Sequence, residues 1–372
     1  MDIQKKSRLS GIELLKLIAM FMIVVSHSGP VYGNAYAESY VNLRVATRNI
    51  QNLLLVVFDY MGQIGNCIFL MCSACFLLEQ QTVKWKKVVY FLGDCLFFSV
   101  CFLIVFLLAG YGLPRMIIIK QFFPTTFEYN WFVGCYLLLY VMHPVLNLII
   151  QNLSRKELLL TDLAGLVLYS VVQMVVRDSF HYNRLIGFIL IYFLMAYSKK
   201  YLKNISSRKK WNLAVLVGSV VLLLGLILVT NVLGLYTDTF SDKMLHFSIF
   251  VNPLMILMAF SALNLFKEMK FQNNVINLLA SVTLYIYVIH ENYLFATYAR
   301  PLYFAYIYQR FTYRNVALWA LVLAIVCYLA SLVIGLFYQA TLRIPVHKVC
   351  DRLAERLPKA ADKCVEYLKK WD

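Results

Sequence analysis

Apolar runs of about 20 residues recur along the whole chain, most of them with few charges. A helix of that length crosses the hydrocarbon core of a bilayer, so many such runs predict a bundle of membrane-spanning helices. The runs are continuous rather than alternating, which argues against strands. The 61% share of hydrophobic residues and the mean hydropathy of +0.69 agree, since soluble domains lie near about 45–50%. The fold class indicated is an all-α polytopic membrane protein.

Ten runs are long enough to count as spans. They are predicted at residues 12–28, 58–79, 88–110, 130–150, 158–176, 184–198, 212–232, 246–266, 278–298 and 315–340. The sequence therefore predicts a transmembrane domain over 1–342 and a basic, weakly amphipathic cytoplasmic tail over 343–372. A cleavage-like Ala35-Tyr36-Ala37 raises the alternative of a signal peptide. Its distance from the apolar core and the nine later spans favour an uncleaved first span.

Lys and Arg are unevenly divided between the two sets of loops. With alternating spans, 24 of the 35 fall on the side of the N-terminus and 10 on the other side, while Lys16 lies inside a span. Because basic loops remain in the cytoplasm, both termini are expected there. The net charge of +16 is then explained by the basic loops that set the orientation of the protein in the membrane. No nucleic-acid partner is expected.

The first span carries Glu13, Lys16 and His27 near one face. Lys16 and His27 are eleven residues apart, which at about 100° per residue brings them back to within about 20° of each other. A polar line in a membrane helix is costly, so it usually faces protein or a water-filled cavity. Two interpretations of Lys16 stay open. It reaches the inner interface as a partner of Glu13, or it belongs to a functional site.

Other polar residues are expected at the outer level of His27. A rise of about 1.5 Å per residue places His290 and Glu291 in the outer half of the ninth span. Further residues expected at this outer level lie near the outer ends of predicted spans. They are Tyr129, Asn130, Trp131, Arg177, Asp178, His181 and Arg184. Trp131 could instead belong to an aromatic belt, and His27 could face outer water. Three successive polar residues at 290–292 need partners inside a span.

Four segments occur in a suggestive order: GIELLKLIAMFMIVVSHS (11–28), FLMCSACFLLE (69–79), NWFVGCYLLLYVMHPVLN (130–147) and LASVTLYIYVIHEN (279–292). In this order they resemble the acyltransferase family 3 of bacterial integral membrane proteins, which commonly O-acetylate sugars of cell-surface polysaccharides. Two departures stand out. Lys16 occupies the position of the family's usual Arg, and Ala74-Cys75 that of its Gly-Tyr. An ammonium keeps the charge but loses the planar fork needed for bidentate recognition.

The resemblance implies an O-acetyltransferase that moves an acetyl group from cytoplasmic acetyl-CoA to a hydroxyl of a cell-surface or lipid-linked saccharide. The bacterial cytoplasmic membrane is the expected location. The expected catalytic residues are His27, His290 and Glu291. The expected donor-side residues are Lys16, Glu13 and Ser73, and the expected acceptor-side residues are Trp131, Asn130 and Arg184. No metal is expected.

Two rival classes remain open at this stage. A polytopic transporter or flippase of a lipid-linked sugar would also explain ten spans with a polar interior, although the paired broken helices typical of transporters are not found. A non-catalytic membrane sensor or assembly partner is the third possibility.

Overall fold

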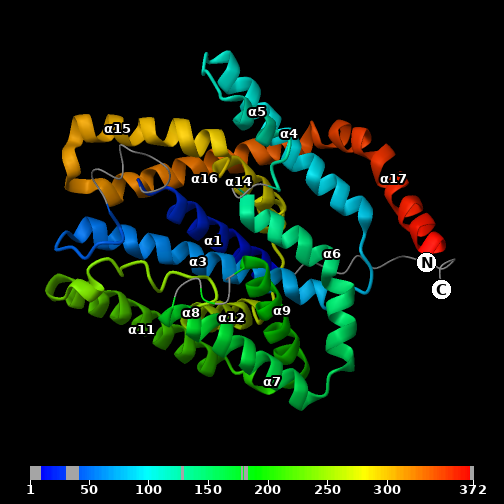
Figure 1. The fold of residues 1–372 in the computed structure, drawn as a ribbon, viewed down its shortest axis with the longest axis horizontal. Helices are drawn as coiled ribbons and strands as arrows, with labels where there is room; N and C mark the ends of the chain where they lie inside the picture. Colours follow the sequence, from blue (N-terminus) through cyan, green and yellow to red (C-terminus); the bar gives the residue numbers. More distant parts are fainter. Residues whose placement is uncertain (1–9, 31–41, 127–129, 177–178, 180–182, 369–372) are drawn as a thin grey trace.

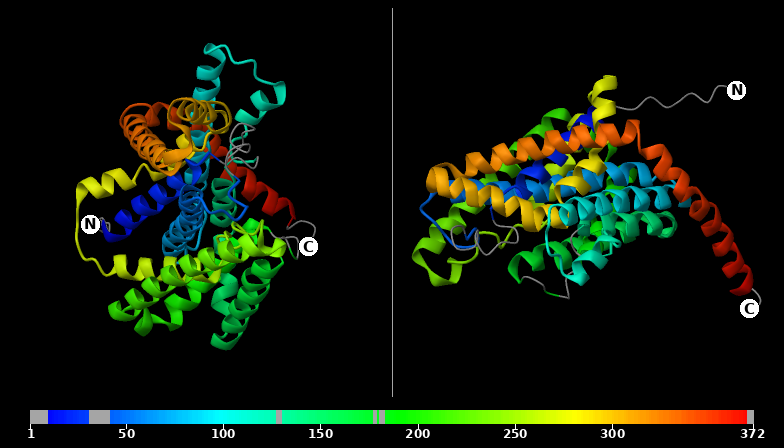
Figure 2. Two further views of the ribbon diagram at one scale, coloured as in Figure 1. Left: turned by 90° about the vertical axis from the view of Figure 1, so that its left-hand side faces the viewer. Right: turned by 90° about the horizontal axis from the view of Figure 1, so that it is seen from above.

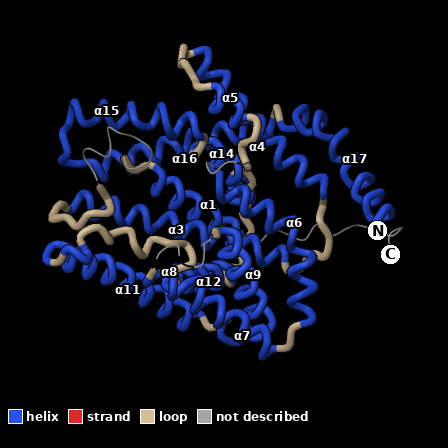
Figure 3. Tube along the Cα trace, viewed as in Figure 1, coloured by secondary structure: helices blue, strands red, loops and turns tan. Residues whose placement is uncertain are grey.

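The structure is a computed structural model that describes residues 10–30, 42–126, 130–176, 179 and 183–368, without the side chains of 312–313 and 357–368. The segment with Ala35-Tyr36-Ala37 lies outside these residues. Every regular element in the described part of the chain is a helix, so the all-α prediction is confirmed. Figure 3 shows that most of the described chain is helical, with loops as the connections between helices.

Within the described residues, seven helical segments are long and apolar enough to cross a membrane. They are α1 (Ser10–His27), α3 (Ile50–Leu77), α4 (Trp85–Leu108), α6 (Trp131–Asn152), the continuous run of α7 (Arg155–Leu166), η2 (Val167–Val171) and α8 (Val172–Val175), α11 (Lys209–Tyr236) and α16 (Val316–Ala340). Two further helices are α9 (Arg184–Tyr201), which has the same length as α1, and the shorter α12 (Pro253–Lys267). The protein is a polytopic membrane protein. The count of ten spans and the orientation stay predictions.

The ninth predicted span, 278–298, is broken. Its segments are α13 (Asn274–Ala280), α14 (Thr283–His290), the π-helical turn η5 (Phe295–Ala299) and α15 (Arg300–Phe311). The halves before and after the break are bent by 57°. At the break, the side-chain oxygen of Asn292 accepts a hydrogen bond from the Leu294 amide at 3.0 Å. Such a local side-chain bond competes with the helical ladder, which explains why the helix ends here.

Two other helices begin at different residues from those predicted. α3 begins at Ile50, eight residues before 58, because the Asn49 side chain caps it through the Gln51 amide. α12 begins at Pro253 rather than 246. There Asn252 accepts from the Leu254 amide and a proline occupies the first turn, both common at a helix start.

α1 lies against α3 at the centre of the bundle (Figure 1). Two glycines of α3 make the close approach possible. A Cβ atom added at Gly65 would lie 2.6 Å from the Ala19 carbonyl oxygen, and one added at Gly62 would overlap the Ser26 side chain. Small residues allow helix backbones to approach in a membrane, where dispersion contacts replace the hydrophobic effect between helices.

The polar line of α1 faces the interior of the bundle, where protein or a water-filled cavity was expected, and Lys16 lines a cavity there. The side chains of Lys16 and Glu13 are 18% and 10% exposed, and that of His27 is 14% exposed. By contrast, Ile18 on another face of the same helix is 39% exposed.

The basic tail is a continuous helix, α17 (Arg343–Leu368), whose first turns pack against α4. Figure 2 shows α17 continuing beyond the bundle from the end of α16.

We expect Gly65→Ala to destabilise the protein, because the added methyl group meets a backbone carbonyl that cannot move without separating α1 from α3. The measurement is the melting temperature of the purified protein in detergent. The matched control is Gly225→Ala in α11, where a Cβ atom has no heavy atom within 4 Å. Equal melting temperatures for the two variants would contradict this account of the interface.

Candidate active site

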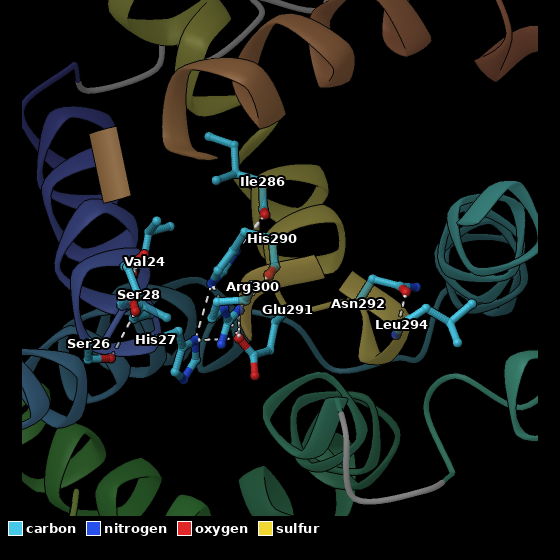
Figure 4. Close-up of polar contacts among 11 residues, drawn as sticks. Val24, Ser26, His27, Ser28, Ile286, His290, Glu291, Asn292, Leu294 and Arg300 are labelled. Atoms are coloured by element: carbon cyan, nitrogen blue, oxygen red, sulfur yellow. Dashed lines mark hydrogen bonds and ion pairs between the residues drawn. The ribbon is translucent and has the colours of Figure 1, made fainter. Parts of the chain in front are cut away.

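Two helix ends bring two histidines together (Figure 4). His27 is the last residue of α1, and His290 is the last residue of α14. The Nδ1 atom of His27 lies 3.1 Å from the Nε2 atom of His290. Their rings stack with centroids 5.4 Å apart and an interplanar angle of 23°. Residues that are 263 positions apart in sequence therefore form one buried polar pair.

Glu291 joins the pair from the first residue after α14. Its Oε2 atom lies 3.0 Å from Nδ1 of His27, within ion-pair and hydrogen-bond range. The polypeptide leaves the helical path at this residue, so the carboxylate turns back toward the end of α1 (Figure 4). The three predicted catalytic residues thus form one cluster.

Arg300 is a fourth member that the sequence reasoning missed. Its Nη2 atom donates to Oε2 of Glu291 at 3.2 Å and to the main-chain oxygen of His290 at 2.9 Å. Arg300 is only 4% exposed. The carbonyl of His290 has lost its helical partner where α14 ends, and Arg300 satisfies it. A signal was present, since Arg300 follows the polar break by only a few residues, but it was counted with the outer loops.

The partners of the two rings indicate their tautomers. His290 Nδ1 lies 2.7 Å from the Ile286 carbonyl oxygen, which can only accept, so this nitrogen carries the hydrogen. His290 Nε2 then bears a lone pair. His27 Nδ1 faces that lone pair and the Glu291 carboxylate, both acceptors, and therefore carries a hydrogen as well. This assignment places the lone pair of neutral His27 on Nε2.

The arrangement suits proton transfer by His27. An imidazole whose Nδ1–H points at a carboxylate is fixed in orientation, and it gains a stabilising partner when Nε2 takes up a proton. The carboxylate is held by a buried guanidinium, which keeps it from turning away. Because the group is mostly withdrawn from water, these charges interact more strongly than they would at a surface.

The same atoms could hold a cation. The donor atoms of His27, His290 and Glu291 all lie within 4.8 Å of one another. However, the Arg300 guanidinium lies 3.2 Å from Oε2 of Glu291 and would repel a metal bound to that oxygen. The electrostatics thus favour a proton between these groups over a metal ion.

Lys16 and Ser73 line a cavity between α1, α3, α4 and α6. Its volume is about 280 Å³, and its lining includes Lys87, Phe76 and Tyr136. Lys16 Nζ lies 3.2 Å from Oε1 of Glu13, as the first of the two interpretations of Lys16 expects. The ammonium also lies 5.2 Å from the centroid of the Phe76 ring. Lys87 supplies a second cation to the cavity.

The three predicted acceptor-side residues lie at the start of α6 and α9. The Arg184 guanidinium lies 4.7 Å from the centroid of the Trp131 ring, a cation–π distance. Asn130 Nδ2 donates to the Pro124 carbonyl oxygen at 3.0 Å, while its buried Oδ1 has no hydrogen-bond partner among the described residues. Tyr129, Arg177, Asp178 and His181 lie outside the described residues.

Aromatic contacts connect this group to the histidines. The Phe132 ring lies 5.7 Å from Trp131 and 5.9 Å from Tyr287, and Tyr287 meets His290 edge to face at 5.7 Å. Trp131 is therefore connected to His290 by a row of packed rings, through Phe132 and Tyr287.

The fold and site define a polytopic membrane protein with a buried histidine–glutamate cluster between two helix ends. A family model described as "Acyltransferase domain", that of acyltransferase family 3, matches residues 9–338. The chain belongs to this family and is a membrane acyltransferase, as the order of its four segments predicts. No curated protein and no solved structure matches the chain.

We expect Arg300→Met to lower stability strongly, because it leaves the buried Glu291 charge and the His290 carbonyl without their donor. Breaking a buried ion pair from one side typically costs about 3–5 kcal/mol. The measurement is a double-mutant cycle with Glu291→Gln, using the free energy of unfolding or the melting temperature in detergent. A second loss that simply adds to the first would contradict direct coupling of these two residues.

Proposed function

We propose that this acyltransferase moves an acetyl group from acetyl-CoA to a hydroxyl of a cell-surface or lipid-linked saccharide, with His27 as the general base. The observation that carries the proposal is the 3.0 Å contact between His27 Nδ1 and Glu291 Oε2, with Arg300 bound to the same oxygen. It supplies a base of fixed orientation inside an acyltransferase fold. The protein would reside in a bacterial cytoplasmic membrane with both termini in the cytoplasm.

In the proposed reaction, His27 Nε2 takes the proton from the acceptor hydroxyl while its oxygen attacks the thioester carbonyl carbon. The new carbon–oxygen bond replaces the carbon–sulfur bond. The CoA sulfur leaves as a thiolate and takes the proton back from the His27 imidazolium. The positive charge that forms on His27 lies against the Glu291 carboxylate, so the contact is strongest at the step where it is needed. His290 accepts from His27 Nδ1 and orients the ring.

The donor would enter through the cavity lined by Lys16, Ser73 and Lys87. Lys16 and His27 are on the same helix, eleven residues apart, or about 16 Å along its axis. The pantetheine arm is an extended, uncharged chain that suits such a passage, while the nucleotide phosphates stay with the basic loops near Lys84 and Lys199. Since Lys16 is already paired with Glu13, Lys87 is the stronger candidate for a phosphate contact.

The acceptor would approach from the side of Trp131. Aromatic faces pack against the apolar faces of sugar rings, and the Arg184 guanidinium above the indole adds donors for hydroxyl groups. Asn130 offers a buried acceptor oxygen close by. Comparison of surface polysaccharide by NMR, with and without the gene, would identify the sugar and the acetylated position.

We expect His27→Ala to lower acetyl transfer by ~10²–10⁴-fold, the range that a general base typically contributes. The measurement is transfer from labelled acetyl-CoA by purified protein, normalised to the amount of folded, membrane-inserted protein. The control is His246→Ala, a loop histidine whose Nε2 lies 2.8 Å from the Met174 carbonyl oxygen, which should keep wild-type activity. Near-wild-type transfer by His27→Ala would sink the assignment.

The same assay tests the absence of a metal. Protein dialysed against a strong chelator should keep its activity, because the Arg300 guanidinium 3.2 Å from Oε2 of Glu291 disfavours a metal on that oxygen. Loss of transfer that added zinc restores would replace the general-base proposal with a metal-dependent one.

We expect Lys16→Arg to keep activity and Lys16→Met to raise the KM for acetyl-CoA. The single Met variant leaves Glu13 buried without its cation, so a loss of activity alone would be ambiguous. The double variant Glu13→Gln/Lys16→Met removes both charges and resolves this. A KM that stays raised in the double variant supports donor binding. Full recovery would show that Lys16 serves only to neutralise Glu13.

A further inference from the structure

The C-terminal helix α17 is fixed to the bundle by a buried polar contact. Asp94, in the middle of α4, accepts hydrogen bonds from His347 Nε2 of α17 at 2.8 Å and from Tyr338 of α16 at 2.6 Å. Tyr285 of α14 bonds the other oxygen of the same carboxylate at 3.2 Å. The His347 ring also stacks on Tyr90 with centroids 3.9 Å apart. Asp94, itself held by Tyr338 and Tyr285, therefore attaches one face of α17 to α4.

One turn further, Asp351 repeats the attachment. Its carboxylate accepts from the Tyr90 hydroxyl at 2.5 Å and lies 3.1 Å from Lys86 Nζ. The hydrogen bond from Tyr90 and then that from Lys86 hold the pKa of Asp351 below its ordinary value, so it is charged at neutral pH. Together with His347, this contact fixes the rotation of α17 about its own axis.

With the rotation fixed, the side chains of α17 fall into four rows at intervals of four residues. The attached row holds Arg343, His347, Asp351 and Glu355, and the next packed row holds Val346, Cys350 and Ala354. The two remaining rows face away from α4. One is Ile344, Lys348, Arg352 and Arg356, and the other is Pro345, Val349 and Leu353.

The two outer rows differ sharply in chemistry. One presents three cations in line, and neither contains an acidic residue between 343 and 356, because Asp351 and Glu355 lie on the attached row. The other is wholly apolar and open. Val349 is 78% exposed and Leu353 is 60% exposed, and Ile344 at the head of the cationic row is 64% exposed.

An apolar row beside a cationic row is the pattern of a helix that lies in a membrane interface. The apolar side enters the boundary of the acyl chains, and the cations meet anionic headgroups. The place of α17 in the chain agrees with an interfacial location, because only residues 341–342 separate α17 from the end of the spanning helix α16. The match to the acyltransferase family ends at residue 338, so this surface is an addition to the part that the family model describes.

We propose that α17 is a docking surface for anionic lipid headgroups of the membrane in which the protein resides. Lys348, Arg352 and Arg356 bind the headgroup phosphates, and Val349 and Leu353 enter the acyl-chain boundary. The contacts of His347 and Asp351 with α4 hold these residues toward the lipid. This surface is separate from the His27 cluster, and the inference does not depend on the proposed reaction.

The test uses the full-length protein in nanodiscs of phosphatidylcholine alone or of phosphatidylcholine mixed with phosphatidylglycerol. Amide hydrogen exchange of residues 343–356 is the readout. We expect exchange at least ~10-fold slower in the anionic discs, and loss of that difference in high salt. Lys348→Gln/Arg352→Gln/Arg356→Gln should remove the difference, whereas Lys203→Gln/Lys209→Gln/Lys210→Gln, a matched change of three exposed lysines elsewhere, should keep it.

Three results would overturn the proposal. The first is equal exchange of wild-type α17 in the two kinds of disc. The second is a lipid-dependent difference that survives the triple change in α17. The third is protection that follows the number of protein copies per disc rather than lipid charge, which would identify a second copy of the chain as the occupant. Glu355→Gln, on the attached row, should leave the lipid-dependent difference in place.

Discussion

The contact of Glu291 with Arg300 and His27 is the constraint on which the rest of the site depends. A carboxylate withdrawn from water persists only with close partners, and removal of a partner from a buried ion pair is costly. The break in the ninth span places Glu291 and Arg300 on the same side, and the end of α1 brings His27 to them. The glycines of α3 seat α1 deeply enough to reach that point. Packing, helix termination and charge compensation are thus parts of one arrangement.

α1 connects two levels of the protein with different chemistry. Its lower part contributes Lys16 to a cavity that already contains Lys87, while its last residue belongs to the histidine–glutamate cluster. The charged donor and the sugar acceptor of the proposed reaction would be poorly soluble in hydrocarbon, so transfer between them would need a protein-lined path and a reaction centre shielded from bulk water. In the proposed reaction, a single helix supplies residues to both, which links donor binding to the position of the base.

Local pattern was enough for much of this picture. The apolar runs predicted the all-helical membrane fold, and the spacing along the first span predicted that its polar line faces protein or a cavity. The separation of three residues allowed the Lys16–Glu13 pair as one of two interpretations, and the structure contains it. Arg300 was not predicted although it follows the polar residues 290–292 closely, because its contact with Glu291 depends on a bend that hydropathy does not register. The sequence predicted only a weakly amphipathic tail. Which rows of α17 are exposed depends on the face that His347 attaches to α4, and the sequence pattern does not show that contact.

The two histidines share one further property, which follows from where they lie on their helices. Both are the last residue of a helix, so the carboxyl ends of α1 and α14 converge on the same point. Each helix end carries a partial negative charge of roughly half an electron from its aligned peptide dipoles, and this charge acts within the last turn. The backbone itself therefore produces a negative potential at the rings, in addition to the Glu291 carboxylate. The ends of α1 and α14 therefore favour positive charge on His27 in the same sense as the Glu291 carboxylate does.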